Sequence, residues 1–140
     1  MDELPSIIAE PVEALIDAGD KLFEKGKYAP ALEKYREALA LLPTDRTQYV
    51  ESAYVLAAVG DTLYLMGEIA EAMEILDEAL DCPEAEVNAF ILLRLGQCLY
   101  DSGDKEAAAE VLATAFALGG EELFEDEEPQ YRKLVQEDEA

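Results

Sequence analysis

Carboxylates are the commonest side chains in this sequence that could take part in chemistry. The 140 residues include 33 Asp and Glu against 10 Lys and Arg, and there is no His. Paired carboxylates can act as an acid and a base, but in so acidic a chain such pairs arise by chance. The run from Glu125 to Glu128 lacks the alternating ligands and the glycine of a calcium loop. We therefore expect no metal site and no acid–base pair.

The two cysteines, Cys82 and Cys98, are the other reactive side chains. Both lie in apolar, helix-like surroundings, so a zinc site or a disulfide framework is not expected and a reducing cytoplasm fits. We predict that Cys98 is an inert thiol in the hydrophobic core. The sequence also has no G-x-S-x-G motif and no glycine-rich phosphate loop. We predict a protein that is not an enzyme and needs no cofactor.

The formal net charge of −23 limits the kinds of molecule that this protein can bind. Nucleic acid and anionic membranes are excluded as partners, because phosphate contacts require Lys and Arg. No apolar run approaches the ~20 residues that span a bilayer, and no basic segment precedes an apolar block at the N-terminus. We therefore expect a soluble cytoplasmic protein whose negative electrostatic field favours a cationic protein or peptide as its partner.

Aromatic residues and carboxylates share one side of three expected helices. At about 100° per residue, the aliphatic and small residues of each helix fall on one stripe and this mixed set falls opposite. The mixed stripe comprises Ile16, Asp17, Asp20, Phe23, Glu24, Tyr54, Ala57, Asp61, Tyr64, Phe90, Leu93, Arg94, Gln97, Tyr100 and Asp101. It indicates a groove for a basic, partly apolar partner, with Arg94 as its only base. Alternatively, the aromatics pack between neighbouring hairpins.

Helices must position these residues, because apolar residues recur at three and four from Val12 to Leu118. The pattern predicts an all-α chain of three helical hairpins. The expected helices run over 12–25, 29–42, 46–66, 69–80, 85–102 and 105–118.

Small residues repeat in register in the three hairpins. Each hairpin has two glycines seven apart, an alanine five residues later and a second alanine seven after that. The first glycine of each pair lies mid-helix, which predicts a close helix crossing, and the second ends the helix. The residues concerned are Gly19, Gly26, Ala31 and Ala38; Gly60, Gly67, Ala72 and Ala79; and Gly96, Gly103, Ala108 and Ala115.

This register resembles the tetratricopeptide repeat family, a helix–turn–helix unit of ~34 residues with a W-x2-L-G-x2-Y, A-x3-F and Pro pattern. The resemblance covers about three quarters of the chain, although Leu stands at the consensus Trp. It implies one α-solenoid domain over 1–140, with repeats at 12–45, 46–83 and 85–118 and a capping segment at 121–137. Gly19 and Gly60 are 41 residues apart, which predicts an extension of about two turns in the second repeat's first helix.

A solenoid exposes an apolar face at its end, and the C-terminal residues can cover it. Pro129 suits the first turn of a helix, and Tyr131, Leu134 and Val135 follow at helical spacing. We predict a capping helix from Glu128 to about Gln136, with Glu137 to Ala140 frayed.

The resemblance implies a protein-binding module. Some family members clamp acidic C-terminal peptides of heat-shock chaperones with Lys, Arg and Asn, but the matching face here carries Asp20, Asp61 and Gln97, which excludes that activity. The sequence is similar to small acidic bacterial repeat proteins encoded beside secreted toxins, so we expect an immunity-type inhibitor. Two alternatives stay open: a type III secretion translocator chaperone, which usually has a longer N-terminal helical region than Met1–Glu10 offers, or a homo-oligomeric assembly adaptor.

Overall fold

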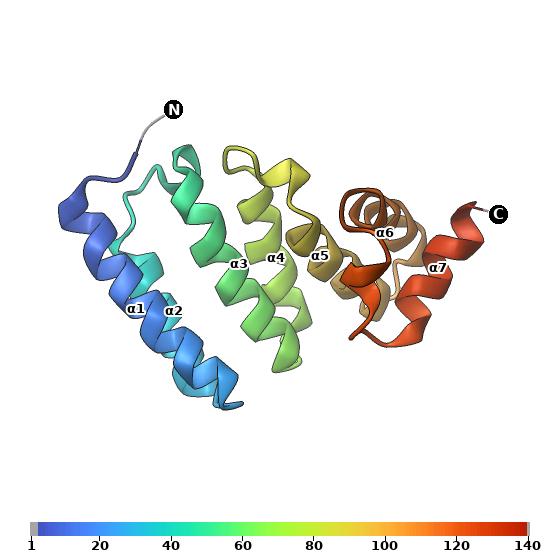
Figure 1. The fold of residues 1–140 in the computed structure, drawn as a ribbon, viewed down its shortest axis with the longest axis horizontal. Coiled ribbons are helices and arrows are strands. Elements are labelled where there is room, and N and C mark those ends of the chain that lie inside the picture. Colours follow the sequence, from blue (N-terminus) through green and yellow to red (C-terminus); the bar gives the residue numbers. More distant parts are fainter. Residues whose placement is uncertain (1–2, 140) are drawn as a thin grey trace.

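The computed structural model describes residues 3–139 and is built from helices that follow one another along the long axis of the molecule (Figure 1). Three helical hairpins stack in chain order, and the two ends of the chain lie at opposite ends of the stack. Helices α1 (Ser6–Glu24), α3 (Val50–Leu65) and α5 (Ala89–Asp101) pair with α2 (Tyr28–Leu41), α4 (Ile69–Leu80) and α6 (Lys105–Gly119). Helix α7 (Pro129–Glu139) packs on α6. The predicted all-α solenoid is confirmed.

Glycines shape each hairpin as the repeat predicts. Gly26, Gly67 and Gly103 have φ angles of 74°, 85° and 100°, so each ends its helix in the left-handed region that favours glycine. A Cβ on Gly60 would lie 2.6 Å from the side chain of Leu76, and the equivalent positions are as tight. A Cβ on Gly19 would lie 2.5 Å from the Tyr35 ring, and one on Gly96 would lie 2.6 Å from the Leu112 side chain. The two helices of each hairpin therefore cross where no side chain fits.

The hydrophobic core consists of two clusters of buried residues, and the partly buried Leu80, Leu99 and Val111 pack against both. The predicted contact alanines, Ala31, Ala72 and Ala108, have no exposed surface. A first cluster of buried residues runs from α1 to α5, and a second lies under the C-terminal end of the chain around Leu93, Leu112 and Phe124.

The first helix starts earlier than predicted. It begins at Ser6 rather than Val12, and Pro11 lies inside it. The segment before it is anchored to the second hairpin, because the Leu4 side chain is buried and its N–H donates to a carboxylate oxygen of Glu51 at 3.3 Å. This tertiary contact places the N-terminal end of the helix where the apolar periodicity alone does not.

The expected extension of the second repeat's first helix is wrong. Residues Arg46–Gln48 form a separate 3-10 turn, Tyr49 is extended at φ −114° and ψ 133°, and α3 begins only at Val50. Arg46 donates two hydrogen bonds to Glu78 of α4, which ties the turn to the second hairpin. The third hairpin starts in the same way, with a 3-10 turn at Ala85–Val87 before α5.

The C-terminal cap forms as a 3-10 turn at Glu121–Phe124 followed by α7. Phe124, Tyr131 and Val135 are buried against the third hairpin, so the predicted cover is present. Helix α7 continues to Glu139, beyond the predicted end at Gln136, and Ala140 lies outside the described residues. Over residues 3–139, none of the helices has the length and apolar character needed to cross a membrane.

Candidate functional site

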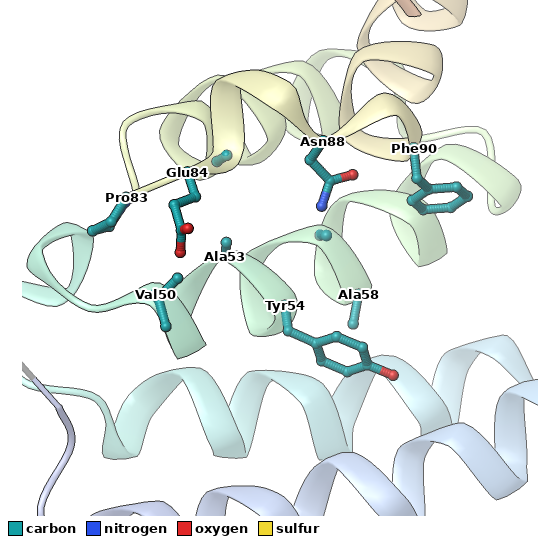
Figure 2. A pocket seen from close by; sticks show the side chains of 10 residues that line it. Val50, Ala53, Tyr54, Ala58, Pro83, Glu84, Asn88 and Phe90 are labelled. Atoms are coloured by element: carbon teal, nitrogen blue, oxygen red, sulfur yellow. The ribbon is translucent and has the colours of Figure 1, made fainter. Parts of the chain in front are cut away.

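Two grooves open on the face formed by the first helices of the hairpins, and Tyr54 of α3 lines both. The N-terminal groove, between α1 and α3, has a volume of about 290 Å³ and is lined by Val12, Glu13, Ile16, Asp17, Asp20, Glu51, Tyr54 and Val55. The central groove, between α3 and the start of α5, has a volume of about 440 Å³ (Figure 2). It is lined by Val50, Ala53, Tyr54, Ala57, Ala58, Pro83, Glu84, Ala85, Asn88 and Phe90.

The N-terminal groove combines an aliphatic floor with an acidic rim. Val12, Ile16 and Val55 are buried beneath it. Four of its eight lining residues are carboxylates, and no described lining residue is basic. The groove can therefore accept a side chain that is apolar along its length and positively charged at its tip.

Two tyrosine hydroxyls hold Asp20 at this rim. Tyr35 donates to Oδ1 at 2.6 Å and Tyr54 donates to Oδ2 at 3.1 Å. Burial, together with the neighbouring Asp20 carboxylate, raises the pKa of both tyrosines above the usual value, so both remain hydrogen-bond donors at neutral pH. No described base forms an ion pair with Asp20, which leaves its negative charge for a partner.

The central groove is mainly apolar. Ala53, Ala57 and Ala58 form its floor, and the Tyr54 and Phe90 rings, which are 58% and 38% exposed, stand at its sides. Asn88 Oδ1 accepts the N–H of Ile91 at 3.1 Å and so caps α5, and Figure 2 shows its amide nitrogen directed toward the groove. Glu84, which has a φ of 67°, reaches toward the floor from the α4–α5 connection.

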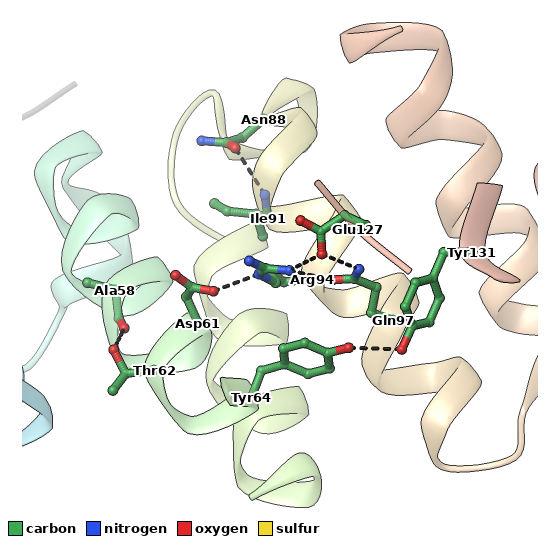
Figure 3. Close-up of polar contacts among 10 residues, drawn as sticks. All are labelled: Ala58, Asp61, Thr62, Tyr64, Asn88, Ile91, Arg94, Gln97, Glu127 and Tyr131. Atoms are coloured by element: carbon green, nitrogen blue, oxygen red, sulfur yellow. Dashed lines mark hydrogen bonds and ion pairs between the residues drawn. The ribbon is translucent and has the colours of Figure 1, made fainter. Parts of the chain in front are cut away.

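Beyond Phe90 the same face is filled by a polar network around Arg94 (Figure 3). Arg94 Nε donates to Asp61 Oδ1 at 2.6 Å, and Nη1 donates to Glu127 Oε1 at 2.7 Å and to Gln97 Oε1 at 2.8 Å. Gln97 Nε2 also donates to Glu127 Oε1, at 2.7 Å. The guanidinium lies 5.3 Å from the Tyr64 ring centroid and 5.1 Å from that of Phe90.

The network leaves Asp61 little freedom to bind anything else. Burial raises the pKa of Asp61, although Arg94 acts in the opposite direction, and the side chain of Arg94 is only 11% exposed. Asp61 is thus an internal partner of Arg94, unlike Asp20. The sequence pattern treated the two as equivalent.

The face formed by the first helices of the hairpins is called the inner face below, and the capping segment covers the part of it that belongs to the third hairpin. Tyr131 donates to Asp101 Oδ1 at 2.7 Å, and its hydroxyl lies 2.9 Å from that of Tyr64. The Tyr131 ring packs edge-on against Tyr100, with centroids 5.3 Å apart. Helix α7 therefore contacts both α5 and α3, and the two grooves lie on the N-terminal side of this contact.

The structure places thirteen of the fifteen predicted site residues either in the grooves or in the region that the capping segment covers, and the other two, Phe23 and Glu24, in neither. Those that line the grooves are Ile16, Asp17, Asp20, Tyr54, Ala57 and Phe90. Those that lie in or under the capped region are Asp61, Tyr64, Leu93, Arg94, Gln97, Tyr100 and Asp101, of which Leu93 and Gln97 are fully buried. Phe23 packs on the Tyr28 ring at 5.2 Å, and Glu24 is exposed at the end of α1.

Several residues that line the grooves are not among those predicted from the sequence. Glu13 precedes Asp17, Asp20 and Glu24 at intervals of four, three and four, so a longer stretch of the acidic stripe could have revealed it. Glu51, likewise, lies three residues before Tyr54. Glu84 and Asn88 come from the α4–α5 connection, whose direction helical periodicity does not predict.

The two thiols do not line either groove. Cys82 and Cys98 are buried free thiols, and burial raises the pKa of Cys82 to about 11 and that of Cys98 to about 12. Among the residues that the structure describes, no group of three His, Cys, Asp or Glu side chains could hold a metal ion.

Comparison with known proteins places the fold. Residues 12–45 match the tetratricopeptide repeat family. The first tetratricopeptide repeat domain of Spaghetti (RPAP3), solved with the HSP90 peptide SRMEEVD, superposes with a TM-score of 0.73 at 16% identity and covers 94% of this chain and 95% of its own. The Yersinia enterocolitica type III secretion chaperone SycD, solved with a peptide of the translocator YopD, gives a TM-score of 0.72 at 15% identity over 93% of both chains.

A further solved structure, MamA, gives a TM-score of 0.64 at 21% identity over 91% of this chain and 78% of its own. No curated protein sequence matches the chain. The repeated Gly and Ala register, the matched hairpin and these superpositions agree. The chain has a tetratricopeptide repeat at residues 12–45 and, over 94% of its length, the fold of a tetratricopeptide repeat protein.

Proposed function

We propose that the chain is a non-enzymatic protein-binding module that sequesters a basic partner by holding an extended segment of it across the two grooves. One observation carries the proposal: the two grooves adjoin at Tyr54, have apolar floors, and carry five carboxylates and no base among their described lining residues. Apolar floors supply contact area, and the acidic rim selects a cationic chain. The net charge of −23 also speeds encounter with such a partner.

Within this proposal, the role we favour is that of an immunity-type inhibitor of a secreted bacterial toxin. A toxin that acts on nucleic acid has a basic active site, because phosphate binding requires Lys and Arg. An acidic face that holds a basic segment would block such a site by charge complementarity and by steric exclusion.

A second role, as a chaperone for a segment of a secreted translocator, is supported by the similarity to SycD. That structure contains a peptide of YopD and shares the fold of this chain over 93% of both chains. Helix α1 begins at Ser6, so part of the region before the first repeat is helical. The two roles differ in the partner, which would be a folded basic toxin domain in one case and an unfolded translocator segment in the other.

The test is capture of the partner on immobilised protein at about 0.1 M and about 1 M salt, where the Debye lengths are about 10 Å and 3 Å. We expect the captured protein to be basic, to be released at high salt, and to be lost with Asp17→Lys plus Asp20→Lys and with Tyr54→Ala. Glu74→Lys plus Asp77→Lys on α4 is the matched control. Capture that persists at high salt and is unchanged by the groove variants would contradict the proposal.

A further inference from the structure

We propose that the two grooves recognise two different side chains of the partner. The N-terminal groove takes a Lys or Arg, and the central groove takes an aliphatic or aromatic side chain about three residues away in the same extended segment. This inference rests on the proposed function and specifies the chemistry of its partner.

The N-terminal groove fits a long basic side chain. Its aliphatic floor of Val12, Ile16 and Val55 matches the methylene stem, and its carboxylates face the charged end. Glu51 contributes an acceptor that is not yet satisfied: one oxygen accepts the N–H of Leu4, while the other, Oε1, is buried without a hydrogen-bond partner. A guanidinium or ammonium group supplies the several donors that such a site lacks.

The central groove fits an apolar side chain instead. Glu84 is its only carboxylate among ten lining residues, against four of eight in the N-terminal groove. Arg94 already lies over the Phe90 ring at 5.1 Å, so one face of that ring is occupied by a cation and a second positive charge there is disfavoured. The groove volume of about 440 Å³ accommodates a Leu, Met or Phe side chain.

Polar groups at the central groove can orient the segment. The amide nitrogen of Asn88 is directed toward the groove (Figure 2), and the oxygen of the same side chain is engaged with Ile91. The amide can thus donate to a backbone carbonyl of an extended segment. Tyr54, which lines both grooves, separates the two side chains.

The spacing follows from helix packing. An α-helix with its side chains is about 10–12 Å wide, and the two grooves lie on either side of one helix, α3. An extended chain advances about 3.4 Å per residue. The basic and the apolar side chain should therefore be about three residues apart.

The experiment measures dissociation constants for fluorescein-labelled Gly-Ser peptides by fluorescence anisotropy. The first peptide carries one Arg and one Leu three residues apart, and the others carry Arg alone, Leu alone, or Glu and Leu. We expect the Arg–Leu peptide to bind at least about tenfold more tightly than either single-residue peptide, a difference of about 1.4 kcal/mol. The Glu–Leu peptide should bind more weakly than the Leu peptide.

Variants assign each side chain to its groove. Asp17→Asn plus Asp20→Asn should weaken binding of the Arg–Leu peptide toward the level of the Leu peptide, with Glu13 and Glu51 still present, and should leave binding of the Leu peptide unchanged. Ala57→Leu fills the central groove and Phe90→Ala removes one of its walls. Both should weaken the Arg–Leu peptide to the level of the Arg peptide and leave the Arg peptide unchanged. Glu74→Gln plus Asp77→Asn on α4 controls for net charge, and thermal melting confirms that each variant is folded.

The outcomes separate the two proposals. If the Arg–Leu peptide and the Arg peptide bind equally well, and only Asp17→Asn plus Asp20→Asn lowers their affinity, the assignment of one side chain to each groove is overturned. The proposed function would then still stand. If the Arg–Leu peptide binds no better than the Glu–Leu peptide, or if Tyr54→Ala leaves its affinity unchanged, both proposals are overturned.

Discussion

At the scale of single residues, Arg94 is the side chain on which the closed part of the inner face depends. It neutralises two partly buried carboxylates, Asp61 and Glu127, that come from different parts of the chain. Carboxylates in such surroundings are costly without a cation, because burial penalises their charged form. Arg94 thereby connects α3, α5 and the capping segment through one guanidinium group.

Arg94→Ala should consequently lower the free energy of unfolding by about 3 kcal/mol, because it leaves two partly buried carboxylates without their cation. Arg36→Ala is the matched control: Arg36 pairs with Glu71 at the surface, where both side chains are 48% exposed. That pair should contribute less than about 1 kcal/mol. Urea unfolding measures both losses, and equal losses would show that Arg94 does not have this role.

Stability should fall at alkaline pH, because burial raises the pKa of Cys82 to about 11, that of Cys98 to about 12 and that of Tyr64 to about 12. In the unfolded chain these groups titrate near ~8.5 for Cys and ~10 for Tyr. The folded state thus retains protons that the unfolded state releases. The contribution of these groups to the free energy of unfolding should be constant below pH ~8 and should decrease from about pH 8.5 to 12.

The thiol contribution can be isolated by urea unfolding at a series of pH values. Cys82→Ala plus Cys98→Ala should remove the part of the slope between about pH 8.5 and 10 and leave the tyrosine part above it. An unchanged slope in the double variant would show that the buried thiols do not contribute.

At the scale of helices, each hairpin depends on one glycine that lets its two helices touch. Gly60→Ala should cost about 1–3 kcal/mol by overpacking, since the added Cβ would lie 2.6 Å from Leu76. Leu76→Ala makes room for it, so the double variant should lose less than the sum of the two single variants. Urea unfolding measures the coupling, and strict additivity would mean that this contact does not limit the crossing.

The sequence predicts the helices and their repeat well because the small residues are placed by contacts within each hairpin. It predicts the ends of helices poorly where a contact between distant segments decides, as when Leu4 packs before α1 and Arg46 pairs with Glu78. The candidate site shows the same limit. Helical rotation places Asp20 and Asp61 on the same stripe. In the folded chain Arg94 and the capping segment enclose Asp61, whereas Asp20 stays open at the rim of the N-terminal groove.

At the scale of the whole molecule, the capping segment divides the inner face into an open half and a closed half. The open half has an acidic N-terminal groove and a mainly apolar central groove that adjoin at Tyr54, whereas in the closed half Glu127 and Tyr131 contact Arg94, Gln97 and Asp101. A partner segment can therefore be bound at the N-terminal and central grooves without displacing the cap.

The charge of the open half predicts which known peptide it will not bind. The peptide SRMEEVD, present in the Spaghetti structure, contains three acidic residues and one basic residue. Repulsion from the groove carboxylates should prevent its binding to this chain even at low salt, where electrostatic effects are largest. Calorimetric titration at about 0.01 M salt checks this, and saturable binding of the peptide would contradict the assignment of the groove as a site for cations.

We propose that the open half around Tyr54, and not the capped half, holds the basic partner. The most direct test compares the dissociation constant of the captured partner for Tyr54→Ala and for Tyr100→Ala, whose ring packs against Tyr131 of the cap. We predict that Tyr54→Ala weakens binding by at least about tenfold, about 1.4 kcal/mol, and that Tyr100→Ala leaves it unchanged. Weakening by Tyr100→Ala with no effect of Tyr54→Ala would contradict the account.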